Sequence, residues 1–316
     1  MAKRNQNQTL LTEFLLLGFG DLQDFKILLF TIFLIIHIMA LTSNILVVAL
    51  VAFIRSLHSP MYIFISQLSL SEIIFTSNIV PNMLWLILVG GGKISIARCI
   101  FQFFLLAFPT VAQCLLLASM SFDRYVAICK PLHYNMIMTF GNQVQIVITC
   151  WLVGFTLSFI VYIFLARLEF CGPNIINHFY CDIAPVVELA CSDISAVELV
   201  TSLVSYPVVL SPFLFISATY ISILHTILKI PSITGRQKSF STCSSHLTIV
   251  CVYYGTLTSI YIFPPSSNSV NINKGMSLLY TLVTPLFNPL IYSLRNQDIR
   301  RAIKKHIQIW NKFLAT

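Results

Sequence analysis

Seven long apolar runs dominate the sequence and most narrowly limit the folds open to it. A helix needs about 20 apolar residues to cross the ~30 Å hydrocarbon core of a bilayer. Seven runs reach that length and short connections separate them, so they predict seven membrane-spanning helices. The runs lie at roughly 25–53, 60–86, 98–122, 142–165, 197–228, 239–263 and 275–294.

Composition supports the same fold class. Hydrophobic residues make up 57% of the chain and charged residues only 9%, whereas a soluble domain carries about 25% charged residues. A soluble chain of this kind would present a very large apolar surface to water. The sequence therefore predicts an all-α membrane protein, a seven-transmembrane helix bundle with no internal repeat. Its parts are an extracellular N-terminal segment (1–24), the transmembrane domain (25–294) and a cytosolic C-terminal segment (295–316).

Lysine and arginine set the expected orientation, because cytosolic loops carry an excess of both. The richer side includes the C-terminus, which we expect in the cytosol of a multi-pass plasma-membrane protein, with the N-terminus extracellular. No cleavable signal peptide is expected, because the first 24 residues are mixed and polar. The positive charge suits anionic membrane lipids and an acidic cytosolic partner, and nothing calls for nucleic acid. The richer side carries Arg55, Arg124, Lys130, Lys229, Arg236, Lys238, Arg295, Arg300, Arg301, Lys304, Lys305 and Lys312, and the other side Lys3, Arg4, Lys26, Lys93, Arg98, Arg167 and Lys274.

The C-terminal segment has an amphipathic pattern. Apolar residues recur every three or four positions at Ile299, Ile303, Ile307, Trp310 and Leu314, and arginine and lysine fill the other face. This pattern predicts a short eighth helix lying on the inner leaflet.

Four cysteines fall outside the membrane or at an outer helix end: Cys99, Cys171, Cys181 and Cys191. That compartment is oxidising, so disulfides are expected, but spacing alone leaves three pairings open. A metal half-site at His178 and Cys181 is the alternative interpretation, and a loop stapled by disulfides is favoured over it. Asn7-Gln8-Thr9 is an acceptor sequence for glycosylation on the same side.

Asp123 and Arg124 stand side by side where the third apolar run ends. The helix from Cys99 to Arg124 is ~37 Å long at 1.5 Å per residue, which places Arg124 at the inner membrane boundary. A boundary arginine alone is typical of a snorkelling anchor. An adjacent acid favours instead an ion pair that holds one state and later breaks.

Four motifs in order give the chain a family resemblance: "PMYIFISQLSLSE" (60–72), "SMSFDRYVAICKPLHY" (119–134), "KSFSTCSSH" (238–246) and "PLFNPLIYSLRN" (285–296). Together they resemble the odorant receptor family of rhodopsin-like G-protein-coupled receptors. The resemblance runs from Glu13-Phe14 to the last helix, and the short outer loop after helix 6 is similar to the tetrapod-type (class II) branch.

The resemblance implies a switch at the cytosolic end. Asp123 restrains Arg124 at rest, and activation turns Arg124 toward the cavity that receives a heterotrimeric G protein, the stimulatory olfactory one, which raises cyclic AMP. Breaking an ion pair near the membrane interface changes the free energy little, so a ligand contributing a few kcal/mol can shift the balance between the paired and the unpaired state. The implied switch residues are Asp123, Arg124, Tyr125, Tyr220, His246, Asn288, Pro289 and Tyr292.

Glu72 is the only acid deep inside a predicted span, and intramembrane ionisable groups are functional by default. In rhodopsin-like receptors the matching acid, with Asn288 nearby, binds sodium. The family often has a second acid where this chain has Gln113, so a single carboxylate remains. The competing interpretation is a protonated Glu72 hydrogen-bonded to Gln113 or Asn288. Apart from this possible sodium ion, no cofactor or metal is expected.

The resemblance places the ligand cavity among the outer halves of helices 3, 5, 6 and 7. Outer helix 3 carries no acid, the middle of helix 7 carries no lysine and outer helix 6 carries no cation. A charged ligand would therefore lack a partner, and a small, neutral, apolar volatile fits best. Ordinary interhelical packing is the alternative for each single residue. The expected ligand-binding residues are Phe103, Leu106, Ala107, Thr110, Val111, Val204, Ser205, Val208, Tyr254, Leu257, Thr258, Tyr261, Leu278 and Thr281.

The family pattern also implies the disulfide pairs Cys99–Cys181 and Cys171–Cys191, which together form a lid over the cavity. Competing functions fit less well. A seven-span transporter favours several intramembrane charges and repeated halves, and the chain has no motif of an enzyme. Within receptors, the alternative is a rhodopsin-like receptor for a non-odorant small lipid or metabolite.

Overall fold

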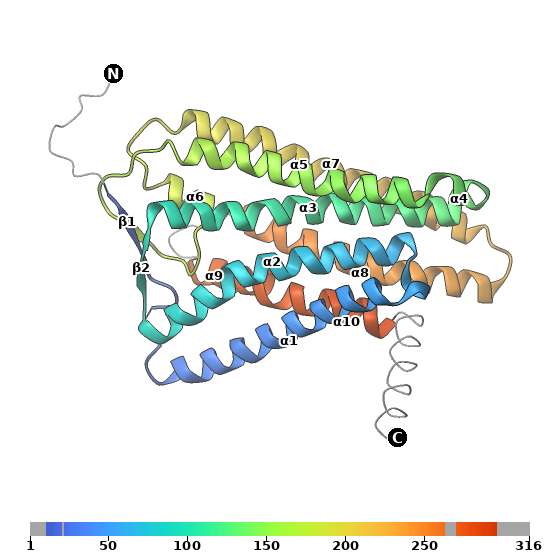
Figure 1. Ribbon diagram of the computed structural model, residues 1–316, viewed down its shortest axis with the longest axis horizontal. Helices are drawn as coiled ribbons and strands as arrows, with labels where there is room; N and C mark the ends of the chain where they lie inside the picture. The colour runs from blue at the N-terminus through green and yellow to red at the C-terminus, as the bar shows by residue number, and fades with distance from the viewer. Residues whose placement is uncertain (1–10, 21, 263–269, 296–316) are drawn as a thin grey trace.

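The protein is a bundle of long helices closed at one end by a small sheet, as the computed structural model shows (Figure 1). The structure describes residues 11–20, 22–262 and 270–295. The helices are α1 (Lys26–Phe53), α2 (Pro60–Val89), α3 (Ile96–Cys129), α4 (Tyr134–Ile137), α5 (Phe140–Leu165), α6 (Ile183–Val187), α7 (Ser195–Leu228), α8 (Ile233–Ile262), α9 (Val270–Leu278) and α10 (Thr284–Arg295). Shorter turns are η1 (Gln23–Phe25), η2 (Arg55–Leu57), η3 (Pro131–His133) and the π-helical η4 (Leu279–Val283).

The seven predicted spans are confirmed as helices to within a few residues at most ends. By length and composition, α1, α2, α3, α5 and α7 each qualify as a membrane span within the described residues. The sixth is α8, and the seventh runs through α9, η4 and α10. The outward faces are apolar: Ile35, Leu203 and Ile221 are more than half exposed. Such a surface is stable facing lipid, not water. The predicted eighth helix, beyond Arg295, lies outside the described residues.

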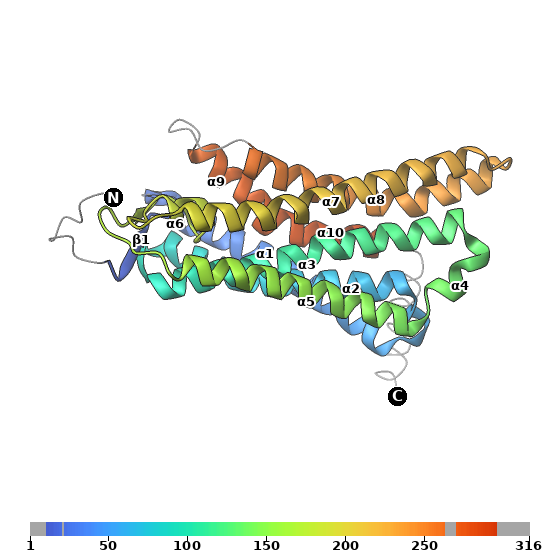
Figure 2. The same cartoon turned by 90° about the horizontal axis from the view of Figure 1, so that it is seen from above.

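Helix α3 lies at the centre of the bundle. It packs against α2, α5, α7 and α8, and in Figure 2 it runs between the side formed by α7 and α8 and the side formed by α2 and α5. Its approach to α5 is close at Gly154, where an added Cβ would meet the Phe108 carbonyl oxygen at 2.7 Å. A small residue is therefore required there, as is common where membrane helices approach closely.

The seventh span is interrupted by the π-helical turn η4. Thr284 Oγ1 donates to the Leu279 carbonyl at 3.3 Å across the wide turn. Asn44 of α1 donates its Nδ2 to the Pro285 carbonyl at 2.9 Å. Side chains of this kind supply the hydrogen bonds that a proline or π-turn removes from the ladder inside a membrane, so α1 holds the interrupted helix in place.

A three-stranded sheet, which the sequence did not predict, covers the end of the bundle that carries the N-terminal segment (Figure 1). Strand β1 (Glu13–Leu16) pairs antiparallel with β2 (Gly92–Ser95) and parallel with β3 (Ile175–Ile176), in the order β2-β1-β3. Phe14 of β1 is fully buried and packs edge-on against Phe170, with ring centroids 5.1 Å apart. The sheet joins the N-terminal segment to the loop between α5 and α7.

Candidate functional site

The predicted ion pair is formed near the C-terminal end of α3. Asp123 is fully buried, and Arg124 Nε donates to its Oδ2 at 2.9 Å, with Nη2 bonded to the same oxygen. Tyr134 of α4 donates its hydroxyl to the other oxygen, Oδ1, at 2.8 Å. Burial, and then the adjacent Asp123 carboxylate, raise the pKa of Tyr134, so it remains a donor at every physiological pH. Both carboxylate oxygens are therefore satisfied, one of them by a loop residue that sequence reasoning missed.

Two of the other predicted switch residues, Tyr220 of α7 and His246 of α8, come together. Tyr220 Oη lies 2.6 Å from His246 Nδ1, and both side chains are buried. Next to Tyr220 in the chain, Thr219 of α7 is hydrogen-bonded to Ser121 of α3. Tyr125 lies apart from the ion pair, with Lys130 Nζ 5.9 Å from its ring centre. Pro289 is buried in α10, and the Tyr292 side chain is outside the described part of the structure.

The intramembrane acid lies between two helices. Asn288 donates its Nδ2 to Glu72 Oε1 at 2.7 Å, and Glu72 is 2% exposed. Gln113 is beside the carboxylate, but its buried Nε2 falls short of hydrogen-bond geometry. The structure thus brings the three predicted residues together, with Asn288 as the close partner.

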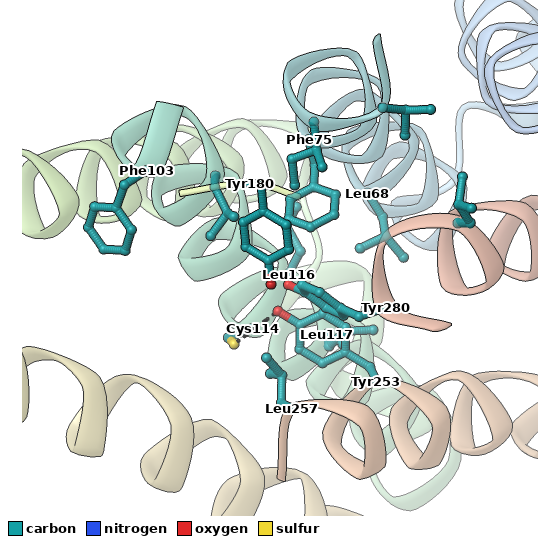
Figure 3. Packing of buried hydrophobic residues seen from close by; sticks show 14 of the residues in the cluster. Leu68, Phe75, Phe103, Cys114, Leu116, Leu117, Tyr180, Tyr253, Leu257 and Tyr280 are labelled. Carbon is teal, nitrogen blue, oxygen red and sulfur yellow. Dashed lines mark hydrogen bonds between the residues drawn. The ribbon is translucent and has the colours of Figure 1, made fainter. Parts of the chain in front are cut away.

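Hydroxyl groups and apolar side chains converge in the centre of the bundle. Thr110 Oγ1 lies 3.1 Å from Tyr280 Oη, and Tyr253 donates its hydroxyl to the Thr110 carbonyl at 2.9 Å. Cys114 Sγ lies 3.3 Å from the Tyr253 hydroxyl. In Figure 3 the phenol oxygens of Tyr180, Tyr253 and Tyr280 point toward one another. None of these three tyrosines was among the predicted ligand residues, since a phenol within an apolar run gives no separate sequence signal.

The predicted ligand residues divide into two groups. Most are buried or half-buried, whereas Ser205 and Thr258 are exposed. Thr281 donates its own hydroxyl to the Ser277 carbonyl at 2.8 Å, and the side chain of Tyr261 lies outside the described residues. The buried and half-buried group is Phe103, Leu106, Ala107, Thr110, Val111, Val204, Val208, Tyr254, Leu257, Leu278 and Thr281.

Two disulfides hold the loop after α5 over the bundle. Cys99 of α3 is bonded to Cys181, and Cys171 to Cys191, with Cα atoms 5.5 and 5.7 Å apart. These are the pairs that the resemblance implied. Because Cys181 is in a disulfide, it has no thiolate to offer a metal, and among the described residues no three His, Cys, Asp or Glu side chains gather as a metal site.

Polar contacts fasten the same loop to the outer end of the seventh span. His178 Nε2 lies 3.2 Å from Ser277 Oγ, and the Tyr180 hydroxyl donates to the same Oγ at 3.3 Å. Lys274, only 8% exposed, donates to Asn177 Oδ1 at 2.7 Å. Burial, and then the Lys274 cation, lower the pKa of His178 to about 3, so the ring is neutral. These contacts of Asn177, His178 and Tyr180 with α9, here called the latch, join residues nearly 100 positions apart, and spacing could not reveal them.

Comparisons with known proteins agree with this geometry. The sequence profile of the olfactory receptor family matches residues 33–309. Olfactory receptor 5P68 of Mus musculus is 45% identical over 303 residues, which cover 96% of each chain. Olfactory receptor 11L1 of Homo sapiens is 42% identical over 300 residues, or 95% of this chain and 93% of the relative. Olfactory receptor 6Q1 of Homo sapiens is 42% identical over 305 residues, or 96% of each.

Proposed function

This chain belongs to the olfactory receptor family, and from that premise we propose that it detects a small, neutral, apolar volatile. The ligand binds in the outer half of the bundle, and the receptor activates the stimulatory olfactory G protein and so raises cyclic AMP. As a G-protein-coupled receptor of the plasma membrane it is not an enzyme. We further propose that its N-terminus is extracellular and its C-terminus cytosolic.

The apolar character of the centre supports the ligand class. The buried and half-buried residues expected to contact the ligand are apolar apart from the hydroxyls of Thr110, Tyr254 and Thr281. Thr110 and Tyr280 already share a hydrogen bond, so a ligand hydroxyl, carbonyl or ether can exchange with it at little cost. A charged ligand has no buried counter-ion among these residues and would pay the cost of desolvation.

The observation that carries the proposal is that one helix, α3, contributes residues both to the proposed ligand site and to the ion pair of the switch. Its outer half contributes Leu106 and Thr110 to the centre, and its inner end carries the closed Asp123–Arg124 pair. The pair is closed and Tyr220 is bonded to His246 of α8, an arrangement we assign to the resting receptor. Outward movement of α8 on activation has to break the contact between Tyr220 and His246. A ligand that binds the active arrangement better shifts the population toward it.

The test is cyclic AMP in cells that co-express the olfactory G protein, exposed in parallel to neutral apolar volatiles, to carboxylates and to amines. Arg124→Ala is compared with wild type at matched surface level, with the lipid-facing Tyr206→Phe as the control variant. We expect at least one volatile to raise cyclic AMP in wild type and in Tyr206→Phe, and not in Arg124→Ala. A response that survives in Arg124→Ala would show that Arg124 is only an anchor. Responses to carboxylates or amines alone would overturn the ligand class.

A further inference from the structure

A groove on the outside of the bundle lies between α3, α5 and α7. These helices run side by side (Figures 1 and 2). The groove has a volume of about 650 Å³ and is lined mostly by apolar side chains, among them Leu115 and Phe122 of α3, Val153 of α5 and Phe215 of α7. It is separate from the centre where the odorant is proposed to bind, since none of the expected ligand residues lines it.

The groove has the length of one membrane leaflet. On α5 its lining runs from Asn142 to Val153, a rise of ~16 Å at 1.5 Å per residue. Half of a ~30 Å hydrocarbon core is ~15 Å. Asn142 lies in the first turn of α5 and Ile137 of α4 closes that end. In the proposed orientation this is the cytosolic end, so the groove spans the inner leaflet and ends near the middle of the bilayer.

Polar side chains lie at the cytosolic end, Asn142 and Gln145, and farther along the groove, Ser119 and Thr149. The Asn142 amide nitrogen donates to the Ile137 carbonyl at 2.8 Å, and Thr149 Oγ1 donates to the Gln145 carbonyl at 2.8 Å. The side-chain amide of Gln145 makes no hydrogen bond within the described part of the chain and is exposed. A free amide offers one acceptor and a pair of donor hydrogens, which suits a hydroxyl group.

Charge decides between lipid classes. None of the residues that line the groove is Lys, Arg, Asp or Glu. A phospholipid head group carries a phosphate, which proteins bind with Lys or Arg, so this groove favours a neutral lipid with a single small polar group. Phe122 and Phe215 form an aromatic wall with ring centroids 6.3 Å apart. A rigid ring system loses less conformational entropy on such a wall than flexible acyl chains do.

We propose that the groove between α3, α5 and α7 is a binding site for a membrane sterol, with the sterol hydroxyl at Gln145 and the ring system against Phe122 and Phe215. The site adjoins the switch at two points. Phe122 precedes Asp123 in α3, and Ile137 ends α4, whose first residue Tyr134 bonds to Asp123. A bound sterol therefore packs against both elements that hold the ion pair closed.

The experiment uses the purified full-length receptor in phosphatidylcholine nanodiscs with a diazirine-bearing cholesterol probe. Labelled peptides are identified by mass spectrometry. We expect labelling on the groove faces of α3 and α5 that excess unlabelled cholesterol competes away. Ala118→Phe and Val153→Phe each fill the groove and should lower labelling about tenfold or more, since overfilling a packed site is strongly unfavourable. Gln145→Ala should lower it about three- to tenfold, the effect of losing one hydrogen bond.

Ile148→Phe is the matched control, because Ile148 is exposed on α5 but does not line the groove. It should label like wild type, and the melting temperature of each variant verifies that it folds. The two filling variants lie on different helices. If one of them misfolds, the other still tests whether the sterol binds in the groove. Labelling that neither filling variant reduces overturns the site. Equal labelling by a diazirine-bearing phosphatidylcholine or diacylglycerol overturns the sterol assignment.

Discussion

Tyr134 illustrates how much a single residue contributes at the inner end of the bundle. Its hydroxyl is the only contact among the described residues that ties Asp123 Oδ1 to the loop after α3. Hydrogen bonds to a charged group contribute roughly 1.5–3 kcal/mol. The closed pair thus depends on a residue 11 positions beyond Asp123 in the chain.

Tyr134→Phe should raise the cyclic AMP level without ligand. Removing this hydrogen bond leaves one oxygen of a buried carboxylate unsatisfied in the closed state. Losing about 1.4 kcal/mol of preference for that state multiplies the ratio of active to resting receptor about tenfold. Basal cyclic AMP is measured at matched surface level, with Tyr206→Phe as the control for loss of a phenol. Unchanged basal signal would mean that Tyr134 does not favour the resting state.

Glu72 presents a choice between a proton and a sodium ion. No cationic side chain bonds to its carboxylate in the described structure; the close partner is the Asn288 amide. A lone buried carboxylate is costly to keep ionised, so we propose that Glu72 is protonated at rest.

Glu72→Gln copies the protonated carboxyl and should leave the response to ligand and the melting temperature nearly unchanged. Replacing sodium with the bulky cation N-methylglucamine should then have no effect on wild type. Melting temperatures of purified wild type and variant in both salts test this. If sodium stabilises wild type by several degrees and leaves Glu72→Gln unaffected, the site binds sodium instead.

Among the elements, the loop after α5 depends most on contacts that the sequence does not display. Two disulfides, the sheet and the latch all fix it. Strands of four and two residues give almost no periodic signal, and their pairing joins segments far apart in the chain. For the same reason the latch could not be predicted: its partners meet only once the bundle has formed.

The latch makes closure of this loop pH-dependent. His178 has a pKa of about 3 when closed and about 6.5 when exposed. Because closure lowers the pKa of His178, the open loop takes up a proton at a higher pH than the closed loop does. Closure is therefore complete above pH 6.5 and weakens as the pH falls, by up to ~1.4 kcal/mol per unit. Of the neighbouring groups, the Lys274 ammonium adds to the lowering of the His178 pKa, and burial raises the pKa of Asp182, which acts in the opposite direction.

His178→Gln keeps a hydrogen-bonding group near Ser277 but does not titrate. Hydrogen exchange of residues 175–181, corrected for intrinsic rates, is compared at pH 7.5 and 5.5. Wild type should lose protection by about tenfold at the lower pH, one unit below the open-state pKa, and His178→Gln should lose much less. His58→Gln, an exposed histidine at the other end of the bundle, is the control. Equal pH dependence in wild type and His178→Gln would contradict the role of His178.

At the scale of the whole molecule, the helices were predictable and their mutual contacts were only partly so. Apolar length fixed seven spans to within a few residues at most ends, because a bilayer leaves a chain few other choices. The family resemblance added the disulfides and brought Glu72, Gln113 and Asn288 together correctly. Ser205 and Thr258 are exposed, unlike the other expected ligand residues described. Helical spacing predicts a shared face of a helix but not the rotation of that helix in the bundle. The role of Ser205 and Thr258 in ligand binding stays a prediction.

Orientation remains to be tested on the whole receptor. If the N-terminus is extracellular, Asn7 enters the lumen where glycans are added, and we expect treatment with peptide N-glycosidase F to increase the electrophoretic mobility of the receptor from cells. Asn7→Gln should migrate like the treated wild type, and Asn5→Gln, which lies outside an acceptor sequence, should migrate like untreated wild type. Glycosidase-sensitive Asn7→Gln would place the glycan elsewhere.

The central strand of the sheet also has a consequence for how the receptor is made. Strand β1 leaves the ribosome first, but its parallel partner β3 begins 159 residues after β1 ends, counting from Leu16 to Ile175. At a synthesis rate of about 5–20 residues per second, roughly ten to thirty seconds separate the two. If the N-terminus is extracellular, as proposed, the nascent chain holds an unpaired strand edge in the lumen during that interval, where a resident chaperone can bind it. The sheet is thus completed only after the four membrane-spanning helices α1, α2, α3 and α5 have been synthesised.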